Sequence, residues 1–308
     1  MPKHTFKPLA AVIGHPVSHS LSPAIFRTLG VTSYDALDIL PEELVAFTNR
    51  LRTEDWVGCN VTLPHKQNVI PCLDLLTSEA QDAGAVNVIE VRRLKSGGLA
   101  RLVGHNTDIY GILQTFKENG VNLRGRRGPS GQNGRNGRNG RNGKTAIIFG
   151  AGGAARAVAS ALARAGAGEV HVWARRRSQA NALVRHCAEH LAIRFPNTRF
   201  KVLARVPESS ADIYINATPL GMKGFKTNRL LPKQVRRGAW AFDLVYRPED
   251  TSFLRQAKKR NLKCIGGLDM LIWQALATRK IWFRQQSEPY VKIKLKRRLR
   301  SIISGKRS

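Results

Sequence analysis

Short apolar runs alternate along this chain with segments whose apolar residues recur every three or four positions. Residues Leu9–Gly14 predict a first buried strand, and Ser22, which precedes a proline, predicts the cap of a helix. In a later segment Leu44, Phe47 and Leu51 fall on one helical face. This alternation of strands and helices indicates an α/β domain of about 110 residues.

The same alternation returns after residue 144, now with a glycine turn between the first strand and the first helix. Residues 145–150 predict a buried strand, 154–165 a helix and 169–174 a second strand. Further strands are expected at 202–206, 212–216, 239–245 and 263–265, and a helix at 268–285. A strand, glycine turn, helix and strand in this order form half of a doubly wound sheet.

Between the two α/β regions the pattern gives way to repeats of glycine, arginine and asparagine, typical of a flexible insertion. We therefore expect a substrate domain at 1–123, with 267–288 packing back on it, and the insertion at 124–143. A Rossmann-like domain is expected at 144–266 and a basic, solvated tail at 289–308. The predicted fold class is α/β, two domains with a cleft between them.

The charge changes this picture more than the rest of the composition does. The chain has 308 residues, 51 Lys and Arg against 21 Asp and Glu, and a net charge of +30. Residues 124–144 hold seven basic residues and no acid, and 289–308 hold eight and no acid. Such a field attracts anionic substrates and phosphorylated cofactors, but also nucleic acid and anionic lipid.

The hydropathy and the cysteine pattern bear on where in the cell the protein is expected. No run approaches the roughly 18 consecutive apolar residues that a membrane span needs, so no membrane-spanning helix is expected. The four cysteines are scattered, with no Cys-x-x-Cys and no histidine at ligand spacing. We therefore expect a cytoplasmic protein without disulfides or a metal site.

The glycine turn carries the first candidate chemistry. Backbone N–H groups at the start of the helix can hold the pyrophosphate of a dinucleotide, and the residues concerned are Gly150, Ala151, Gly152, Gly153 and Ala154. After the second strand the chain reads Arg175, Arg176 and Arg177, where an NAD site usually has an acid. Arginine matches a 2′-phosphate in charge and geometry, so NADP is favoured over a merely solvated basic loop.

Two further segments carry a lysine and a carboxylate. They are Asn60–Lys66 (Asn-Val-Thr-Leu-Pro-His-Lys) and Gly104–Asp108 (Gly-His-Asn-Thr-Asp). Taken singly, Lys66 could be an exposed lysine and Asp108 a helix cap. If they converge beside a nicotinamide cofactor, they can move the proton that an alcohol/ketone redox reaction requires.

From about Leu9 to Gln274, apart from the insertion, the chain resembles the shikimate dehydrogenase family. The segments that carry the resemblance, in order, are 13–23, 60–66, 84–87, 106–108, 150–154, 216–222, 243–248 and 266–274. Where the family usually continues to a His-Asn pair after Ser22-Pro23, this chain has Phe26-Arg27.

The resemblance implies a cytoplasmic oxidoreductase that reversibly reduces 3-dehydroshikimate to shikimate with NADP, in aromatic amino-acid biosynthesis. It implies that Lys66 and Asp108 form the catalytic pair, with Lys66 either transferring the proton or chiefly stabilising the alkoxide. The implied substrate-binding residues are Ser20, Ser22, Thr62, Asn87, Tyr246 and Gln274. Thr218 and Gly267 join the cofactor-binding set. Ser20 and Ser22, two residues apart, would face the same way in an extended loop.

Other functions stay open at this point. Within the class, quinate or an aminated shikimate is an alternative substrate. From another class, the charge is compatible with a nucleic-acid-binding protein that has a dehydrogenase fold but no longer acts as an enzyme. It is also compatible with an enzyme whose basic segments associate weakly with nucleic acid or an anionic surface. A monomer and a homodimer are both compatible with the sequence.

Overall fold

A computed structural model of the chain describes residues 9–94, 97–125, 143–205, 210–222, 224–225, 230–285 and 289–305. The chain forms two compact units: the first runs to Thr107 and resumes at Ile272, and the second spans Asp108–Leu271. This boundary lies before the one predicted from the sequence, after residue 123. The difference is helix α5 (Asp108–Glu118), which packs on helix α6 (Gly153–Arg164) of the second unit.

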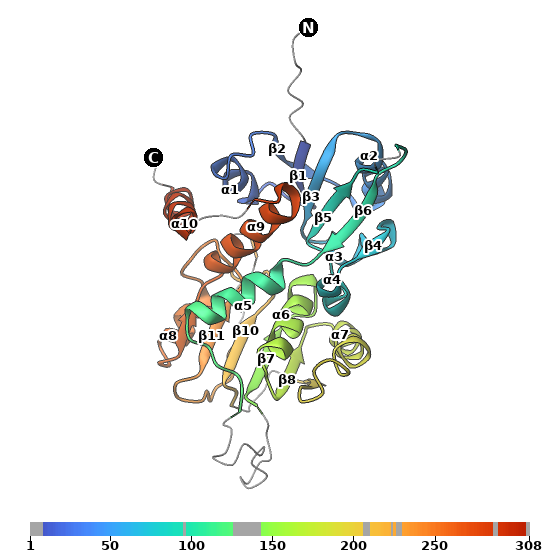
Figure 1. Cartoon of the computed structure of the whole chain (residues 1–308). Helices are drawn as coiled ribbons and strands as arrows, with labels where there is room; N and C mark the ends of the chain where they lie inside the picture. The colour runs from blue at the N-terminus through green and yellow to red at the C-terminus, as the bar shows by residue number, and fades with distance from the viewer. Residues whose placement is uncertain are drawn as a thin grey trace. The chain divides into compact units, whose positions relative to one another are not determined.

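The first unit is built on a six-stranded sheet with the order β2-β1-β3-β5-β6-β4 (Figure 1). Its strands are β1 (Leu9–Gly14), β2 (Tyr34–Asp38), β3 (Trp56–Val61), β4 (Leu75–Leu76), β5 (Val88–Arg92) and β6 (Arg101–His105). Its helices are α1 (Ser22–Thr28), α2 (Leu44–Thr53), α3 (His65–Asn68), α4 (Ser78–Ala83), α9 (Leu268–Phe283, from Ile272 on) and α10 (Pro289–Ile303). Short 3₁₀ turns occur at Pro41–Glu43 and Ile70–Cys72. The sheet is mixed, because β5 runs antiparallel to β3 and β6.

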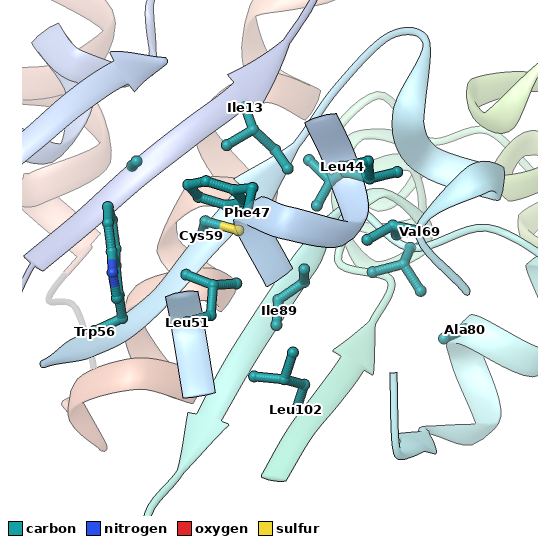
Figure 2. Close-up of a cluster of buried hydrophobic side chains, with 13 residues drawn as sticks. Ile13, Leu44, Phe47, Leu51, Trp56, Cys59, Val69, Ala80, Ile89 and Leu102 are labelled. Carbon is teal, nitrogen blue, oxygen red and sulfur yellow. The ribbon is translucent and has the colours of Figure 1, made fainter. Parts of the chain in front are cut away.

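One hydrophobic core cluster of this unit lies between the sheet and helix α2 (Figure 2). Leu44, Phe47 and Leu51 are all buried, as their helical spacing predicted. Phe47 meets Trp56 of β3 edge to face, with ring centroids 5.7 Å apart. Cys59 lies in the same cluster, and its burial raises the pKa of the thiol well above the usual range.

The second unit has a six-stranded, wholly parallel sheet, in the order β12-β11-β10-β7-β8-β9. Its strands are β7 (Thr145–Phe149), β8 (Glu169–Trp173), β9 (Arg199–Val202), β10 (Ile213–Asn216), β11 (Trp240–Asp243) and β12 (Lys263–Ile265). Its other helices are α7 (Arg177–His190) and α8 (Ser252–Lys258). The strand order reverses between β10 and β7, so this is the predicted doubly wound fold.

Helices cover both faces of this sheet (Figure 1). On one face Phe253 of α8 meets Phe149, with ring centroids 6.2 Å apart. On the other face Phe116 of α5 meets Phe242, at 5.8 Å. Phe149 aligns with Asp243 across β10, so Phe242, one residue earlier, faces the opposite side.

Three local predictions were wrong. The strand expected at 202–206 is β9, which ends at Val202. The N-cap of α1 is Leu21, and the backbone N–H of Ser22 itself donates to Oγ of Ser20 over 3.2 Å. The solvated tail is helix α10 as far as Ile303, because its leucines at 295 and 299 are fully buried.

Residues 126–142 of the predicted insertion lie outside the described part of the chain, and the residues flanking them are joined. Arg124 and Gly143 form an antiparallel bridge, and the backbone N–H of Lys144 donates to the Leu123 carbonyl over 2.9 Å. A Cβ on Gly143 would lie 2.5 Å from the backbone nitrogen of Gly168. The bridge sits next to the start of β7, at the opposite end of that strand from Gly150–Ala154.

We expect that replacing residues 126–142 by Asn-Gly leaves activity unchanged, because a three-residue loop can close an antiparallel pair. The free energy of unfolding should stay equal or rise by at most about 1.5 kcal/mol, since loop closure costs only about 0.6 kcal/mol per doubling of length. Urea denaturation and steady-state kinetics measure both. Gly143→Val, which crowds Gly168, is the matched variant that should destabilise. A folded but inactive loop replacement would refute this prediction.

Candidate active site

Two of the predicted substrate motifs lie side by side at the ends of β1 and β3 in the first unit. The backbone N–H of Thr62 donates to the Ile13 carbonyl and that of His15 to the Leu63 carbonyl, both over 2.9 Å. A Cβ on Gly14 would lie 2.5 Å from Cγ2 of Thr62. Glycine therefore allows the backbone of β1 to approach the threonine that the resemblance assigns to substrate.

Lys66 lies on the short helix α3, which two contacts anchor. His65 is fully buried and its Nε2 lies 2.6 Å from the Ile39 carbonyl oxygen. The carbonyl of Lys66 itself accepts a 2.7 Å hydrogen bond from the backbone N–H of Val86. The half-buried lysine side chain therefore starts from a backbone fixed directly beside the asparagine motif.

Asn87 joins the lysine motif to the aspartate motif. Its Oδ1 accepts from the backbone N–H of Thr107 over 2.7 Å, and its Nδ2 donates to Thr107 Oγ1 over 2.9 Å. Asn106 donates from Nδ2 to the Ala85 carbonyl over 2.8 Å. Asp108, the buried first residue of α5, follows directly on this fixed segment.

Gln274 belongs to the same buried polar cluster, although it lies far along the chain. Its Oε1 is 3.4 Å from Nδ2 of Asn87 and 3.4 Å from Oγ1 of Thr107. Helix α9 supplies this residue, and all three side chains are less than a tenth exposed. The structure thus brings together Asn87 and Gln274, two of the predicted substrate-binding residues.

Three members of this cluster, Tyr34, Asn60 and Thr278, were not predicted as site residues. Tyr34 donates to Oδ1 of Asn60 over 2.8 Å, and Asn60 Nδ2 lies 3.4 Å from Thr278 Oγ1. Thr278 in turn lies 3.4 Å from Thr107. Thr278 follows Gln274 by four residues, a spacing that places both on one helical face and so was a usable signal. No comparable signal in the sequence points to Tyr34.

Ser20 and Ser22 do not form the extended pair that their spacing suggested. Leu21 between them has helical backbone angles, so Ser22 turns into the first turn of α1. There Ser22 is buried and hydrogen-bonds to Tyr34, whose pKa is raised by burial and partly lowered again by this contact. Ser20 stays half-buried at the loop. Phe26, at a position where the family differs, stacks on Tyr34 with centroids 4.4 Å apart.

The predicted cofactor-binding residues of the second unit all follow the carboxyl ends of parallel strands. Gly150 has a φ of 114°, and a Cβ there would lie 2.9 Å from the Ala217 carbonyl oxygen. Gly152 is the N-cap of α6, with no atom within 4 Å of a Cβ position, so its backbone is open to a ligand. The first turn of α6 can therefore accept a pyrophosphate at the switch point of the sheet.

Arg175 and Arg176 follow β8 next to this turn, because the backbone N–H of Gly150 donates to the Trp173 carbonyl over 2.8 Å. Both arginines are exposed, and within the described ranges no ion pair with a carboxylate involves either one. Their guanidinium groups are thus available for a phosphate, which fits NADP.

A buried carboxylate organises the loops after β10 and β11. Asp243 Oδ1 accepts from Nδ2 of Asn216 over 2.9 Å and from the backbone N–H of Val245 over 3.0 Å, and Oδ2 accepts from Thr251 Oγ1 over 2.6 Å. Burial raises the pKa of Asp243 to about 6, although these hydrogen bonds lower it. Asn216 Oδ1 in turn accepts from both the backbone N–H and the hydroxyl of Thr218.

Gly267 and Tyr246 complete this edge. A Cβ on Gly267 would lie 2.3 Å from the Leu244 carbonyl oxygen, so only glycine fits against the loop after β11. Tyr246, half-buried, follows Val245 in that loop. The predicted residues of the second unit therefore gather along the carboxyl edge of its sheet.

The described residues contain no group of three or more His, Cys, Asp or Glu side chains arranged to hold a metal ion. Among the helices of the described ranges, none has the length and apolarity that crossing a membrane requires.

A doubly wound sheet with an arginine-flanked glycine turn, joined to a unit with a buried cluster of amides and hydroxyls, defines a dinucleotide-dependent oxidoreductase of polar substrates. A family model described as "Shikimate dehydrogenase substrate binding domain" matches residues 12–89. Shikimate dehydrogenase (NADP(+)) of Moorella thermoacetica is 36% identical, over 96% of this chain and 95% of the relative. The chain belongs to the shikimate dehydrogenase family.

Solved structures agree with this assignment. A Thermus thermophilus shikimate 5-dehydrogenase in complex with NADP(H) and shikimate has a TM-score of 0.71 and 34% identity, covering 94% of this chain and 99% of that one. A shikimate dehydrogenase in complex with NADP+ has a TM-score of 0.77 and 32% identity, with 95% of each chain covered. A Listeria monocytogenes shikimate 5-dehydrogenase in complex with shikimate and NAD has a TM-score of 0.74 and 27% identity, covering 96% of this chain and 99% of that one.

Proposed function

We infer that this protein is an NADP-dependent shikimate dehydrogenase, which reversibly reduces the ketone of 3-dehydroshikimate to the alcohol of shikimate. The observation that carries this function is the meeting of three family motifs at Val86 and Asn87. The backbone N–H of Val86 donates to the Lys66 carbonyl, and Asn87 Oδ1 accepts from the backbone N–H of Thr107. Family membership over nearly the whole chain supports the same reaction.

We propose that Ser20, Ser22, Thr62, Asn87, Gln274 and Tyr246 hold the carboxylate and hydroxyls of the substrate. A polyol acid offers several donors and acceptors, and a site built from amides and hydroxyls rejects analogues that lack them. Asn87, Thr107 and Gln274 place amide and hydroxyl groups within 3.4 Å of one another, which matches the hydrogen-bonding groups of such a substrate.

When bound, NADPH supplies a hydride to the ketone carbon. The substrate oxygen then becomes an alkoxide, and a cationic donor beside it lowers the barrier. We propose that the ammonium of Lys66 supplies this hydrogen bond or proton, and that Asp108 orients it. In the reverse direction the Lys66 amine takes the hydroxyl proton back.

We propose that the residues Gly150–Ala154, Thr218 and Gly267 line the dinucleotide, with Arg175 and Arg176 at its 2′-phosphate. Arg175→Ala should therefore raise KM for NADPH about 10- to 100-fold more than KM for NADH, because a charge-assisted hydrogen bond contributes about 1.5–3 kcal/mol. Initial rates with each cofactor measure this. Arg185→Ala, an exposed arginine on α7, is the matched control and should leave both values unchanged. Equal effects of Arg175→Ala on the two cofactors would contradict the assignment.

The direct test of the function is the absorbance of the reduced nicotinamide, followed with shikimate or quinate and with NADP or NAD. We expect turnover of shikimate with NADP at the highest kcat/KM. Preferred turnover of quinate would change the substrate, and a folded protein that turns over no pair would refute the function.

We further propose a cytoplasmic enzyme, either a monomer or a homodimer, whose basic segments associate weakly with nucleic acid or another anionic surface. The cysteines of the described residues are all free, which fits a reducing compartment. Size-exclusion chromatography coupled to light scattering, at two salt concentrations, measures the oligomeric state.

A further inference from the structure

The basic helix α10 has no role in the proposed redox reaction. Helix α10 has no acidic residue between Pro289 and Ile303 and carries six lysines and arginines there. It belongs to the first unit, where it packs on helix α1 (Figure 1). A basic stretch ordered against the protein presents its charges on a fixed face, which a solvated tail does not.

The side of α10 that packs inward is apolar. Leu295 and Leu299 are both fully buried, one turn apart. Lys292, on the same side, places its ammonium 4.9 Å from the centre of the Trp273 ring on α9. The helix therefore uses its apolar face within its own unit.

The outward side of α10 combines one aromatic ring with a cationic stripe. Tyr290, Lys294 and Arg297 follow one another at helical spacings of four and three residues, so they lie along one line. All three are exposed, as is Arg298 beside them, and the tyrosine is 66% exposed. Within the described ranges no ion pair joins Lys294, Arg297 or Arg298 to a carboxylate.

From this face we propose that α10 binds a single-stranded nucleic acid, with Lys294, Arg297 and Arg298 on its phosphates and a base stacked on Tyr290. Guanidinium groups match phosphate geometry, and an exposed aromatic ring offers a stacking platform that any unpaired base can use. The proposal does not depend on the redox function.

A bilayer surface fits this face less well. A helix that lies on a membrane inserts an apolar stripe into the lipid, and on α10 that stripe is already buried against the protein. Outward-facing apolar groups are limited, in the described helix, to the tyrosine and to Ile293, which is 72% exposed. Charge remains the main recognition element, and charge with an aromatic ring favours an unpaired strand.

The test titrates the full chain into a fluorescently labelled 20-nucleotide uridine RNA at several salt concentrations. The variant combines Lys294→Gln, Arg297→Gln and Arg298→Gln. For single strands each phosphate contact contributes about 0.7 to the slope of log K against log salt, so the slope should fall by about 2. The matched control removes three exposed cations of the second unit, by Lys117→Gln, Lys233→Gln and Arg237→Gln, and should keep the slope of the unaltered protein.

Tyr290→Ala gives an independent reading, because it removes the stacking platform and no charge. It should weaken RNA binding about tenfold or more and leave binding to a 20-base-pair duplex DNA unchanged. All variants should retain shikimate oxidation, which shows that they fold.

The alternatives give distinct results. An equal loss of slope in the control triple would mean that net charge alone attracts RNA, and would overturn the proposal. Loss of binding on replacement of residues 126–142, with the α10 triple unaffected, would do the same. Binding to phosphatidylserine vesicles without binding to RNA would assign the face to lipid instead.

Discussion

Replacement of Lys66 by alanine is expected to lower kcat for shikimate oxidation by about 10²- to 10⁴-fold, the usual contribution of a positioned acid or base. The change in KM should be much smaller, because the amide and hydroxyl cluster around Asn87 and Gln274 would still hold the substrate. Steady-state rates at saturating NADP measure the two constants separately.

The matched control for this variant lies on the same short helix. Asn68 is exposed at the end of α3, so Asn68→Ala should leave kcat unchanged and show that the helix tolerates alanine. Lys66→Arg separates the two roles left open for the lysine. It keeps a cationic hydrogen-bond donor but cannot exchange a proton, so retained activity would mean stabilisation of the alkoxide. A comparable kcat in Lys66→Ala would remove the residue from the mechanism.

The strands and the dinucleotide-binding turn could be predicted from the sequence because they depend on a local pattern of residues. The first strand, the buried face of α2 and the strand-glycine-helix unit at β7 and α6 are each encoded within about 20 residues or fewer. The arginines after β8 were equally visible, since an acid is expected at that place in an NAD site. In each case neighbouring residues carry the information.

Contacts between distant segments were not accessible in the same way. The line from Tyr34 through Asn60 to Thr278 joins three elements that only the folded sheet and helix α9 bring together. The order of α10 depends on the packing of its apolar face, and helix α1, on which α10 packs, lies at the other end of the chain. A basic composition therefore suggested a tail where packing of an apolar stripe produces a helix.

Asp243 is another residue whose importance arises only in the folded sheet. Asn216 and Asp243 are paired in register on β10 and β11, which places the two side chains next to each other. The carboxylate is fully buried and has hydrogen-bond donors but no cation among the groups that affect its pKa. When Asp243 is ionised, its hydrogen bonds hold the loops of Thr218 and Val245 in place, but the buried negative charge destabilises the folded protein.

The sign of the resulting pH dependence follows from the raised pKa. Because the pKa of Asp243 rises from 3.8 in the unfolded chain to about 6 in the folded protein, the folded state binds the proton more tightly. The stability that this proton contributes is complete below about pH 3.8 and is lost as the pH rises through 6. The loss amounts to about 3 kcal/mol at neutral pH, at 1.36 kcal/mol per pKa unit.

Asp243→Asn should remove this dependence, since asparagine resembles the protonated side chain and is not charged at any pH. Relative to the unaltered protein, the free energy of unfolding of the variant should rise by about 2 kcal/mol between pH 4.5 and 7.5. Urea denaturation at the two pH values measures it. Asp243→Ala is the contrasting variant, because it leaves the donors of Asn216, Val245 and Thr251 without their acceptor and should destabilise at both pH values. A difference between Asp243→Asn and the unaltered protein that stays constant with pH would mean that this carboxyl group does not carry a buried charge.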